Sequence, residues 1–247
     1  MSTDFIIRTQ AVTRRFGGFV ALNDVSIDFE RGKLTSIIGP NGAGKSTFFN
    51  ILSGSFAPSS GKVIFNGKDI TGYKQHRFSH IGIAKSFQIT NIFPRFSVIE
   101  NVRIALQAQV SRFNLWQSRT SLDLIEQAHV LLRTVGIDAH ARRHAADLAH
   151  GQQRALEIAI ALASHPSLLL LDEPTAGMSP EETKSMIDLI VKLASERTVI
   201  LVEHKMKMVM GISDRLVVLH HGEYLASGSP SDIRNNDEVK RVYLGQH

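Results

Sequence analysis

The nine residues GPNGAGKST, from Gly39 to Thr47, constrain the fold of this chain more than any other stretch. They fit the pattern G-x-x-x-x-G-K-[ST], in which small residues let successive backbone N–H groups converge on phosphate oxygens. An apolar stretch, LTSII, precedes the loop, and a helical pattern, STFFNILSG, follows it. Strand, glycine-rich loop and helix in this order predict a phosphate-binding loop in an α/β fold, with the positive end of the helix facing the anion.

Two side chains extend the chemistry of this loop beyond its backbone. Lys45 adds a positive charge near the β- and γ-phosphates of a nucleotide, and Ser46 offers a hydroxyl group to Mg²⁺. We therefore expect the whole loop to bind nucleotide phosphates. The residues concerned are Gly39, Pro40, Asn41, Gly42, Ala43, Gly44, Lys45, Ser46 and Thr47.

The segment LLLLDEPTAG, from Leu168 to Gly177, runs from four leucines straight into two carboxylates. In a parallel α/β sheet, ligands bind beyond the carboxyl ends of the strands. The pattern therefore predicts that Asp172 emerges from a buried strand beside the phosphate loop, where it suits Mg²⁺ directly or through water. Glu173 points elsewhere and could polarise an attacking water. A helix-capping role is the alternative, but the next helix begins only after Pro180, too far from Asp172.

The remaining chain alternates between strand and helix patterns, which predicts a parallel sheet covered by helices. The first 38 residues are rich in strand patterns, and the stretch from about residue 97 to residue 136 has helical periodicity. We expect a core with a β-rich N-terminal part, formed by residues 1–87 and 151–247, and an inserted helical subdomain formed by residues 88–150.

Composition excludes several other kinds of protein. The net charge is +5, but the lysines and arginines are scattered without a long block, so we expect no binding to nucleic acid. The chain has no cysteine, which excludes disulfides and thiolate metal sites. No apolar run approaches the roughly 18 residues that span a bilayer, and the N-terminal stretch lacks the apolar segment of a signal peptide. We expect a cytosolic protein that reaches a membrane only through a partner.

Four further features stand in an order that is typical of one family. They are Phe16 in RRFGG, Gln88 in SFQITNIFPRFSVIENV, the segment LAHGQ from Leu148 to Gln152, and His204 in ILVEHKM. Together with the phosphate loop and the LLLLDE strand, they resemble the motifs of the ATP-binding cassette (ABC) family. The resemblance covers nearly the whole chain. It implies a P-loop NTPase core of the ABC ATPase kind, with an antiparallel β subdomain and an inserted α-helical subdomain.

The resemblance also implies that two cassettes pair head to tail and trap two ATP molecules. Each ATP lies between the phosphate loop of one cassette and the LAHGQ segment, the signature motif, of the other. Phe16 matches the aromatic residue that stacks on adenine. The signature residues that would bind the partner's nucleotide in trans are Ala149, His150, Gly151 and Gln152, with a helix N-terminus at Gly151 facing the γ-phosphate.

The same resemblance implies the roles of the remaining site residues. Glu173 would act as the general base, and His204 would hold the γ-phosphate and the attacking water in line. Gln88 would sense Mg²⁺, which Ser46 and Asp172 also hold, and would link the site to the helical insert. Hydrolysis would let the dimer open, and a membrane partner would use that motion.

Four positions depart from the common family pattern. The signature is usually LSGGQ, and here Ala149 and His150 replace serine and glycine. The serine hydroxyl is therefore lost, which leaves backbone N–H groups and the helix dipole to bind phosphate. Ser179 stands where an aspartate is usual. Lys205 follows His204, the switch histidine of the family, at a position where most members of the subgroup described next have aspartate. We expect this difference to be surface variation.

The sequence around these departures resembles that of one subgroup of the family. The matching stretches are LA-x-GQ, AGM-x-P, VEHKMKMVMGISDRLVVL and the ending GSPSDIRNNDEVKRVYLGQH. They resemble the ATPases of importers for branched-chain amino acids and of relatives that carry urea, short amides or aromatic acids. The resemblance implies a peripheral subunit on the cytoplasmic face of the inner membrane. Its partners would be membrane-spanning permease subunits, a second ABC ATPase subunit (identical or different) and, indirectly, a solute-binding protein.

Phe93, Pro94 and Phe96 are candidates for the surface that couples this subunit to the membrane partner, with local packing as the alternative. The histidines offer a separate hypothesis. His140, His144 and His150 lie close together in the sequence, and His76 and His80 are four apart. A spacing of i, i+4 can place two imidazoles on one helix face for zinc, but no acid or third histidine completes a recognised ligand pattern. We expect these histidines to be solvated or to cap helices.

Two other functions compete with that of a transporter subunit. A soluble cassette ATPase that acts on nucleic acid or ribosomes usually carries two cassettes or a long coiled-coil insertion, for which 247 residues leave no room. A non-catalytic scaffold that binds nucleotide only for assembly is disfavoured by Lys45, Asp172, Glu173 and His204, although Ala149 keeps it open.

Overall fold

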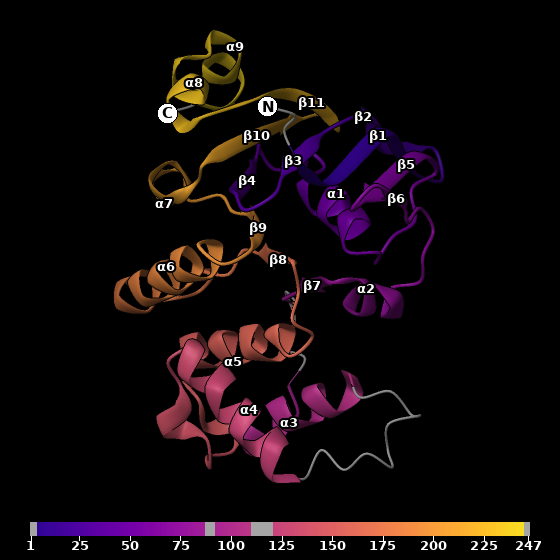
Figure 1. Cartoon of the computed structure of the whole chain (residues 1–247). Coiled ribbons are helices and arrows are strands. Elements are labelled where there is room, and N and C mark those ends of the chain that lie inside the picture. The colour runs from indigo at the N-terminus through magenta and orange to yellow at the C-terminus, as the bar shows by residue number, and fades with distance from the viewer. Residues whose placement is uncertain (1–3, 87–91, 110–120, 245–247) are drawn as a thin grey trace.

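Residues 4–86, 92–109 and 121–244 of this chain are described by the computed structural model. Figure 1 shows an antiparallel sheet with α1 beside it, a central parallel sheet, and a group of helices, α3 to α5, at the end opposite to α8 and α9. Among the described residues, none of the helices has both the length and the apolarity needed to cross a bilayer.

The N-terminal part of the chain forms the antiparallel sheet. Strand β1 lies at its centre, because β1 pairs with β2, β3 and β5. The strands are β1 (Phe5–Phe16), β2 (Phe19–Val25), β3 (Asp28–Glu30), β5 (Ser60–Phe65) and β6 (Lys68–Asp69). Helix α1 (Lys45–Leu52) packs against them, with the rings of Phe29 and Phe48 stacked at 6.3 Å. The predicted β-rich start is confirmed, and β2 is an addition that the sequence patterns did not single out.

The central sheet confirms the predicted parallel arrangement, except for one antiparallel strand at its edge. Its order is β11-β10-β4-β9-β8-β7, and only β11 runs antiparallel to its neighbour. The strands are β4 (Leu34–Ile38), β7 (Ile83–Lys85), β8 (Leu168–Asp172), β9 (Thr198–Val202), β10 (Arg215–His220) and β11 (Glu223–Gly228). In the register, Val202 of β9 is level with Ile37 on one side and with Asp172 on the other. The carboxyl ends of these three strands therefore meet at one edge.

Burial on both faces explains why the strand Leu168–Leu171 is apolar at every position. Leu169 and Leu171 belong to the core that packs against the helices, whereas Leu168 and Leu170 belong to the core shared with α1 and the antiparallel sheet. All four side chains are fully buried. This is the expected pattern for a parallel strand, in which alternate residues face opposite layers of the protein.

The helices cover the sheet and extend the molecule at two ends. They are α2 (His76–Ile81), α3 (Val98–Gln109), α4 (Ser121–Thr134), α5 (His150–Leu162), α6 (Pro180–Ala194), α7 (Met206–Ile212), α8 (Pro230–Asn235) and α9 (Asp237–Val239), with a π-helical turn at Lys240–Leu244 and 3₁₀ turns at Asp138–His140 and Ala145–Asp147. Helices α3 and α4 confirm the helical periodicity predicted near residues 97–136. Because α5 packs on α3, α4 and α6 alike, the boundaries of the inserted subdomain stay a prediction.

Candidate nucleotide-binding and hydrolysis site

Two glycines shape the loop between β4 and α1. Gly39 has a φ of 153°, and an added Cβ would lie 2.2 Å from the carbonyl oxygen of Leu219 on β10. Gly44 has a φ of 92° and caps α1 without a side-chain hydrogen bond. The first N–H groups of α1 are therefore left for another acceptor, which is the arrangement that binds phosphate at a helix N-terminus.

Lys45 begins α1 and folds back over this loop. Its ammonium group donates to the carbonyl oxygens of Gly39 at 2.7 Å and Pro40 at 2.9 Å. Burial lowers the pKa of Lys45, and the nearby carboxylate of Glu173 opposes that shift. The lysine charge is thus disfavoured by its surroundings, and an anion placed on the loop would stabilise it.

We expect Gly39→Ala to destabilise the protein by on the order of 3 kcal/mol, because the added methyl group overlaps a backbone oxygen that cannot move without shifting β10. Denaturation in urea measures the effect. Gly211→Ala is the matched control, since Gly211 lies in α7 with open space around its Cβ position. Equal midpoints for the two variants would contradict this account of the loop.

Asp172 ends β8 as a nearly buried carboxylate that is 4% exposed. Burial raises the pKa of Asp172, Glu173 raises it further, and Lys85 acts in the opposite direction. The Lys85 ammonium group donates to the side-chain oxygen of Asn50 on α1 at 2.7 Å. The patterns of the sequence did not identify Lys85 or Asn50, because the pairing of β7 with β8 brings Lys85 to this carboxylate and Asn50 contacts Lys85 from α1.

We expect Asp172→Asn to raise the melting temperature of the nucleotide-free protein at pH 7. The pKa of Asp172 in the folded protein lies above 3.8, its ordinary value. At pH values between the ordinary pKa and the raised pKa, the native state binds more protons than the unfolded state, so stability falls as pH rises through this range. Removing the charge removes this loss of stability, and each kcal/mol regained raises the melting temperature by about 2–4 °C in a chain of this size. Thermal unfolding from pH 3 to pH 8 tests this, and a lower melting temperature for Asp172→Asn at pH 7 would contradict it.

Glu173 and His204 face each other just beyond the ends of β8 and β9. The distance from His204 Nδ1 to Glu173 Oε1 is 3.8 Å, too long for a hydrogen bond, and their side chains are 55% and 31% exposed. The Glu173 N–H donates to Val202 O at 2.8 Å, and Glu173 has a φ of 43°. A non-glycine residue in this left-handed region costs about 1–3 kcal/mol, and such strain concentrates at functional sites. Both side chains therefore reach solvent at the edge where the phosphate loop begins.

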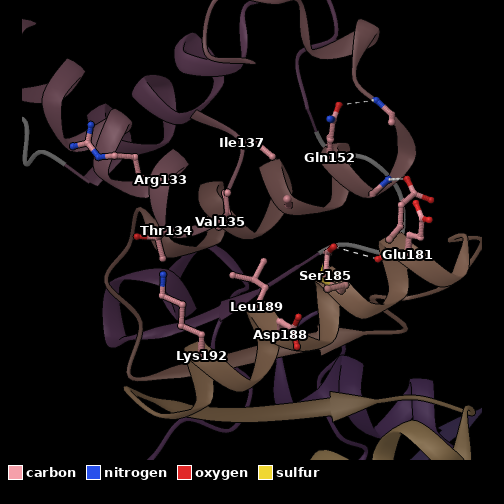
Figure 2. A pocket seen from close by; sticks show the side chains of 16 residues that line it. Arg133, Thr134, Val135, Ile137, Gln152, Glu181, Ser185, Asp188, Leu189 and Lys192 are labelled. Carbon is pink, nitrogen blue, oxygen red and sulfur yellow. Dashed lines mark hydrogen bonds between the residues drawn. The ribbon is translucent and has the colours of Figure 1, made fainter. Parts of the chain in front are cut away.

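The signature residues lie at the N-terminus of α5, beside a cavity of about 730 Å³ between α4, α5 and α6 (Figure 2). The Gly151 N–H donates to Glu182 Oε1 on α6 at 3.0 Å, and the Ala149 N–H donates to Gln152 Oε1 at 3.1 Å. The His150 ring nitrogen Nε2 lies 3.1 Å from Ala176 O. The Gly151 N–H, which the resemblance assigns to the phosphate of the partner's nucleotide, is therefore already hydrogen-bonded to Glu182. Because α5 lies well away from α1 in Figure 1, one chain does not bring the two halves of the expected site together.

Phe16 lies at the end of β1 and is 41% exposed. Its ring makes an edge contact with Phe56 at 5.6 Å, and the Arg14 guanidinium lies 4.6 Å from the ring centre. A flat, partly exposed ring beside a fixed cation can stack on a base. Gln88 lies outside the described residues, so its predicted role rests on the sequence alone.

Of the histidines considered for zinc, two have other contacts. His140 Nε2 lies 3.0 Å from the side-chain nitrogen of Gln152, and His150 contacts the Ala176 carbonyl as described above. Within the described ranges, no group of three or more His, Cys, Asp or Glu side chains is arranged to hold a metal ion.

The expectation that Lys205 is surface variation is wrong. Its side chain is partly buried, and its ammonium group donates to Thr175 O at 2.9 Å, in the loop that follows Glu173. Sequence reasoning also missed Glu203, although a signal existed: TVILVE is a second apolar strand that ends in a carboxylate, like LLLLDE.

The fold and the site together define a nucleotide-binding α/β protein with a phosphate loop and two carboxylates at the adjacent strand end. Residues 22–176 match the family model described as ABC transporter, and residues 225–247 match the one described as branched-chain amino acid ATP-binding cassette transporter. The chain belongs to the ABC transporter family and is its ATPase component, the ATP-binding cassette. The fold and family predicted from the motifs are thereby confirmed.

Curated relatives and solved structures agree with this assignment. The chain is 39% identical to the high-affinity branched-chain amino acid transport ATP-binding protein LivG of Salmonella typhimurium, over 98% of each chain. It is 40% identical to the corresponding protein BraF of Pseudomonas aeruginosa, again over 98% of each chain. A crystal structure of the ADP conformation of an ATP-binding cassette is 31% identical, with a TM-score of 0.87 over 99% of this chain and 100% of that one.

Proposed function

We propose that this chain is the ATP-hydrolysing subunit of an importer for branched-chain amino acids. The observation that carries the hydrolytic part is the meeting of Lys45, Asp172, Glu173 and His204 at one edge of the parallel sheet, in front of the uncapped start of α1. The names of the relatives and the family match over residues 225–247 support branched-chain amino acids as the transported substrate. Importers of urea, short amides or aromatic acids are the alternative.

In this proposal the phosphate loop and Lys45 hold the β- and γ-phosphates, and Phe16 stacks on the adenine. Glu173 accepts a proton from the attacking water, because its carboxylate reaches solvent beside the loop while Asp172 stays buried. His204 faces the same space and donates to the γ-phosphate, which keeps phosphate and water in line. The leaving group is ADP, and no covalent intermediate on the protein is required.

The residues present suit Mg²⁺ as the accompanying cation. Asp172 is a carboxylate whose burial makes its own charge unfavourable, and Ser46 is an exposed hydroxyl at the start of α1. Oxygen donors of this kind are the ligands that Mg²⁺ prefers, together with phosphate oxygens. When bound, the ion would neutralise charge on the β- and γ-phosphates. Gln88 is a further ligand in the proposal, on the resemblance alone.

The proposal includes a second cassette, because the α5 N-terminus and the phosphate loop of one chain lie apart. The residues Ala149, His150, Gly151 and Gln152 would bind the nucleotide of the partner. Residues 88–150 would form the subdomain that moves with the permease, at the cytoplasmic face of the membrane. Phe93 and Phe96 are candidates for that contact, since they are 51% and 45% exposed with their rings 5.5 Å apart.

A pull-down followed by transport assays tests the proposal. The Glu173→Gln form, tagged and trapped with ATP and Mg²⁺, is expected to bring down two polytopic membrane proteins and a cassette ATPase from solubilised membranes. The recovered complex, rebuilt with wild-type subunit in vesicles, is expected to take up leucine, isoleucine or valine when ATP is inside. Uptake of urea or amides alone would favour the alternative substrates. Recovery of ribosomes or of soluble proteins only would reject the transporter.

A further inference from the structure

Glu203 is a fully buried carboxylate that directly follows β9 and directly precedes His204. Its Oε1 accepts hydrogen bonds from the hydroxyl and, at 3.3 Å, from the N–H of Thr175. Its Oε2 accepts from the N–H groups of His204 at 3.0 Å and Lys205 at 3.4 Å. One side chain thus binds the backbone of two segments, the loop after β8 and the segment after β9.

A buried carboxylate is costly unless donors surround it, and here four donors do so. Because these hydrogen bonds are charge-assisted and shielded from water, they hold both segments more firmly than neutral surface contacts would. Lys205 adds a second link between the same segments through its bond to Thr175 O at 2.9 Å.

The two linked segments carry the two side chains assigned to hydrolysis. Thr175 lies two residues after Glu173, and Glu203 lies one residue before His204. The 3.8 Å separation between Glu173 and His204 is not maintained by a hydrogen bond between them, so it depends on the backbones that carry them. A misplacement of about 1 Å at a reacting group can cost about 100-fold in rate.

We propose that Glu203 is a positioning residue for ATP hydrolysis: by joining Thr175 to the backbone of His204, it holds the glutamate and the histidine at a working separation. It does not touch the nucleotide, and it acts only through the segments it binds. The inference rests on the proposed roles of Glu173 and His204.

The test removes one hydroxyl group. Thr175→Val keeps the shape of this fully buried residue but takes the hydroxyl donor from Glu203, and Thr175→Ser keeps that donor. Thr198→Val is the matched control, because Thr198 is 1% exposed and its hydroxyl accepts from the Gly32 N–H at 2.9 Å, away from the switch. Steady-state hydrolysis, equilibrium ATP binding and thermal unfolding are measured for all three.

We expect Thr175→Val to lower kcat about tenfold or more while KM for ATP stays within about twofold. Thr175→Ser is expected to restore kcat to within about twofold of the wild type, and Thr198→Val to lower the melting temperature without lowering kcat. Unchanged kcat in Thr175→Val, or an equal loss of kcat in Thr198→Val, would overturn the inference. Glu173→Gln separates the two proposals: if it still hydrolyses ATP near the wild-type rate, the role of Glu173 as the base fails, whereas an inactive Glu173→Gln beside a fully active Thr175→Val rejects only the role of Glu203.

Discussion

Glu173→Gln is expected to lower the rate of ATP hydrolysis by about 10²–10⁴-fold and to leave ATP binding intact. The side chain is the partly exposed carboxylate at the edge where β4, β8 and β9 end, and it faces His204. The amide of glutamine has the same shape but cannot accept the proton of the attacking water. Its neutrality also removes a negative charge that raises the pKa of Asp172, so binding of a nucleotide with Mg²⁺ should not weaken.

Single-turnover hydrolysis and equilibrium ATP binding measure the two effects separately. Glu126→Gln serves as the control, because Glu126 is an exposed carboxylate on α4 that pairs only with Arg133 among the contacts described. We expect it to leave both quantities unchanged. If Glu173→Gln hydrolysed ATP at a rate near that of the wild type, another group would have to be the base.

Lys45→Met is expected to weaken ATP binding by about 10- to 100-fold, the value of one charge-assisted contact to phosphate. The lysine lies on the loop with its pKa lowered by burial, so its charge disfavours the nucleotide-free fold. The pKa of Lys45 in the folded protein lies below 10.5, its ordinary value. At pH values between the lowered pKa and the ordinary pKa, the stability of the wild type should therefore rise with pH, and Lys45→Met should lack that rise.

Titration of ATP against each protein, followed by pH-dependent unfolding, tests both parts. Lys33→Met is the control, since Lys33 is an exposed lysine just before the opposite end of β4. Equal ATP affinity in Lys45→Met and Lys33→Met would contradict the placement of the γ-phosphate beside Lys45.

The features that could be predicted from the sequence are those whose cause is local. A glycine-rich loop between an apolar strand and a helix predicts a phosphate site, because glycine adopts the positive φ of Gly39 and Gly44 without the strain that other residues meet there. Four consecutive leucines predict a strand buried on both faces, and the residue after such a strand must lie at the sheet edge. The prediction that Asp172 ends a buried strand at the sheet edge is confirmed.

The residues that were missed share a different property, which is that their partners are distant in the chain. Lys85 reaches Asn50 across 35 positions, and Glu203 reaches Thr175 across 28. Lys205 illustrates the consequence: judged against a family pattern it is a substitution, whereas in the fold it bonds to the loop after Glu173. Glu182 likewise meets Gly151 only because α5 and α6 pack together.

The sequence by itself determined the kind of protein, the phosphate loop and the strand that presents Asp172 and Glu173, since glycine positions and apolar runs act within a few residues of themselves. Only the tertiary structure decided how the ends of β8 and β9 are tied together and how far apart Glu173 and His204 stand. That outcome depends on which strands become neighbours, and the pairing of strands is a property of the whole packed sheet rather than of any one segment.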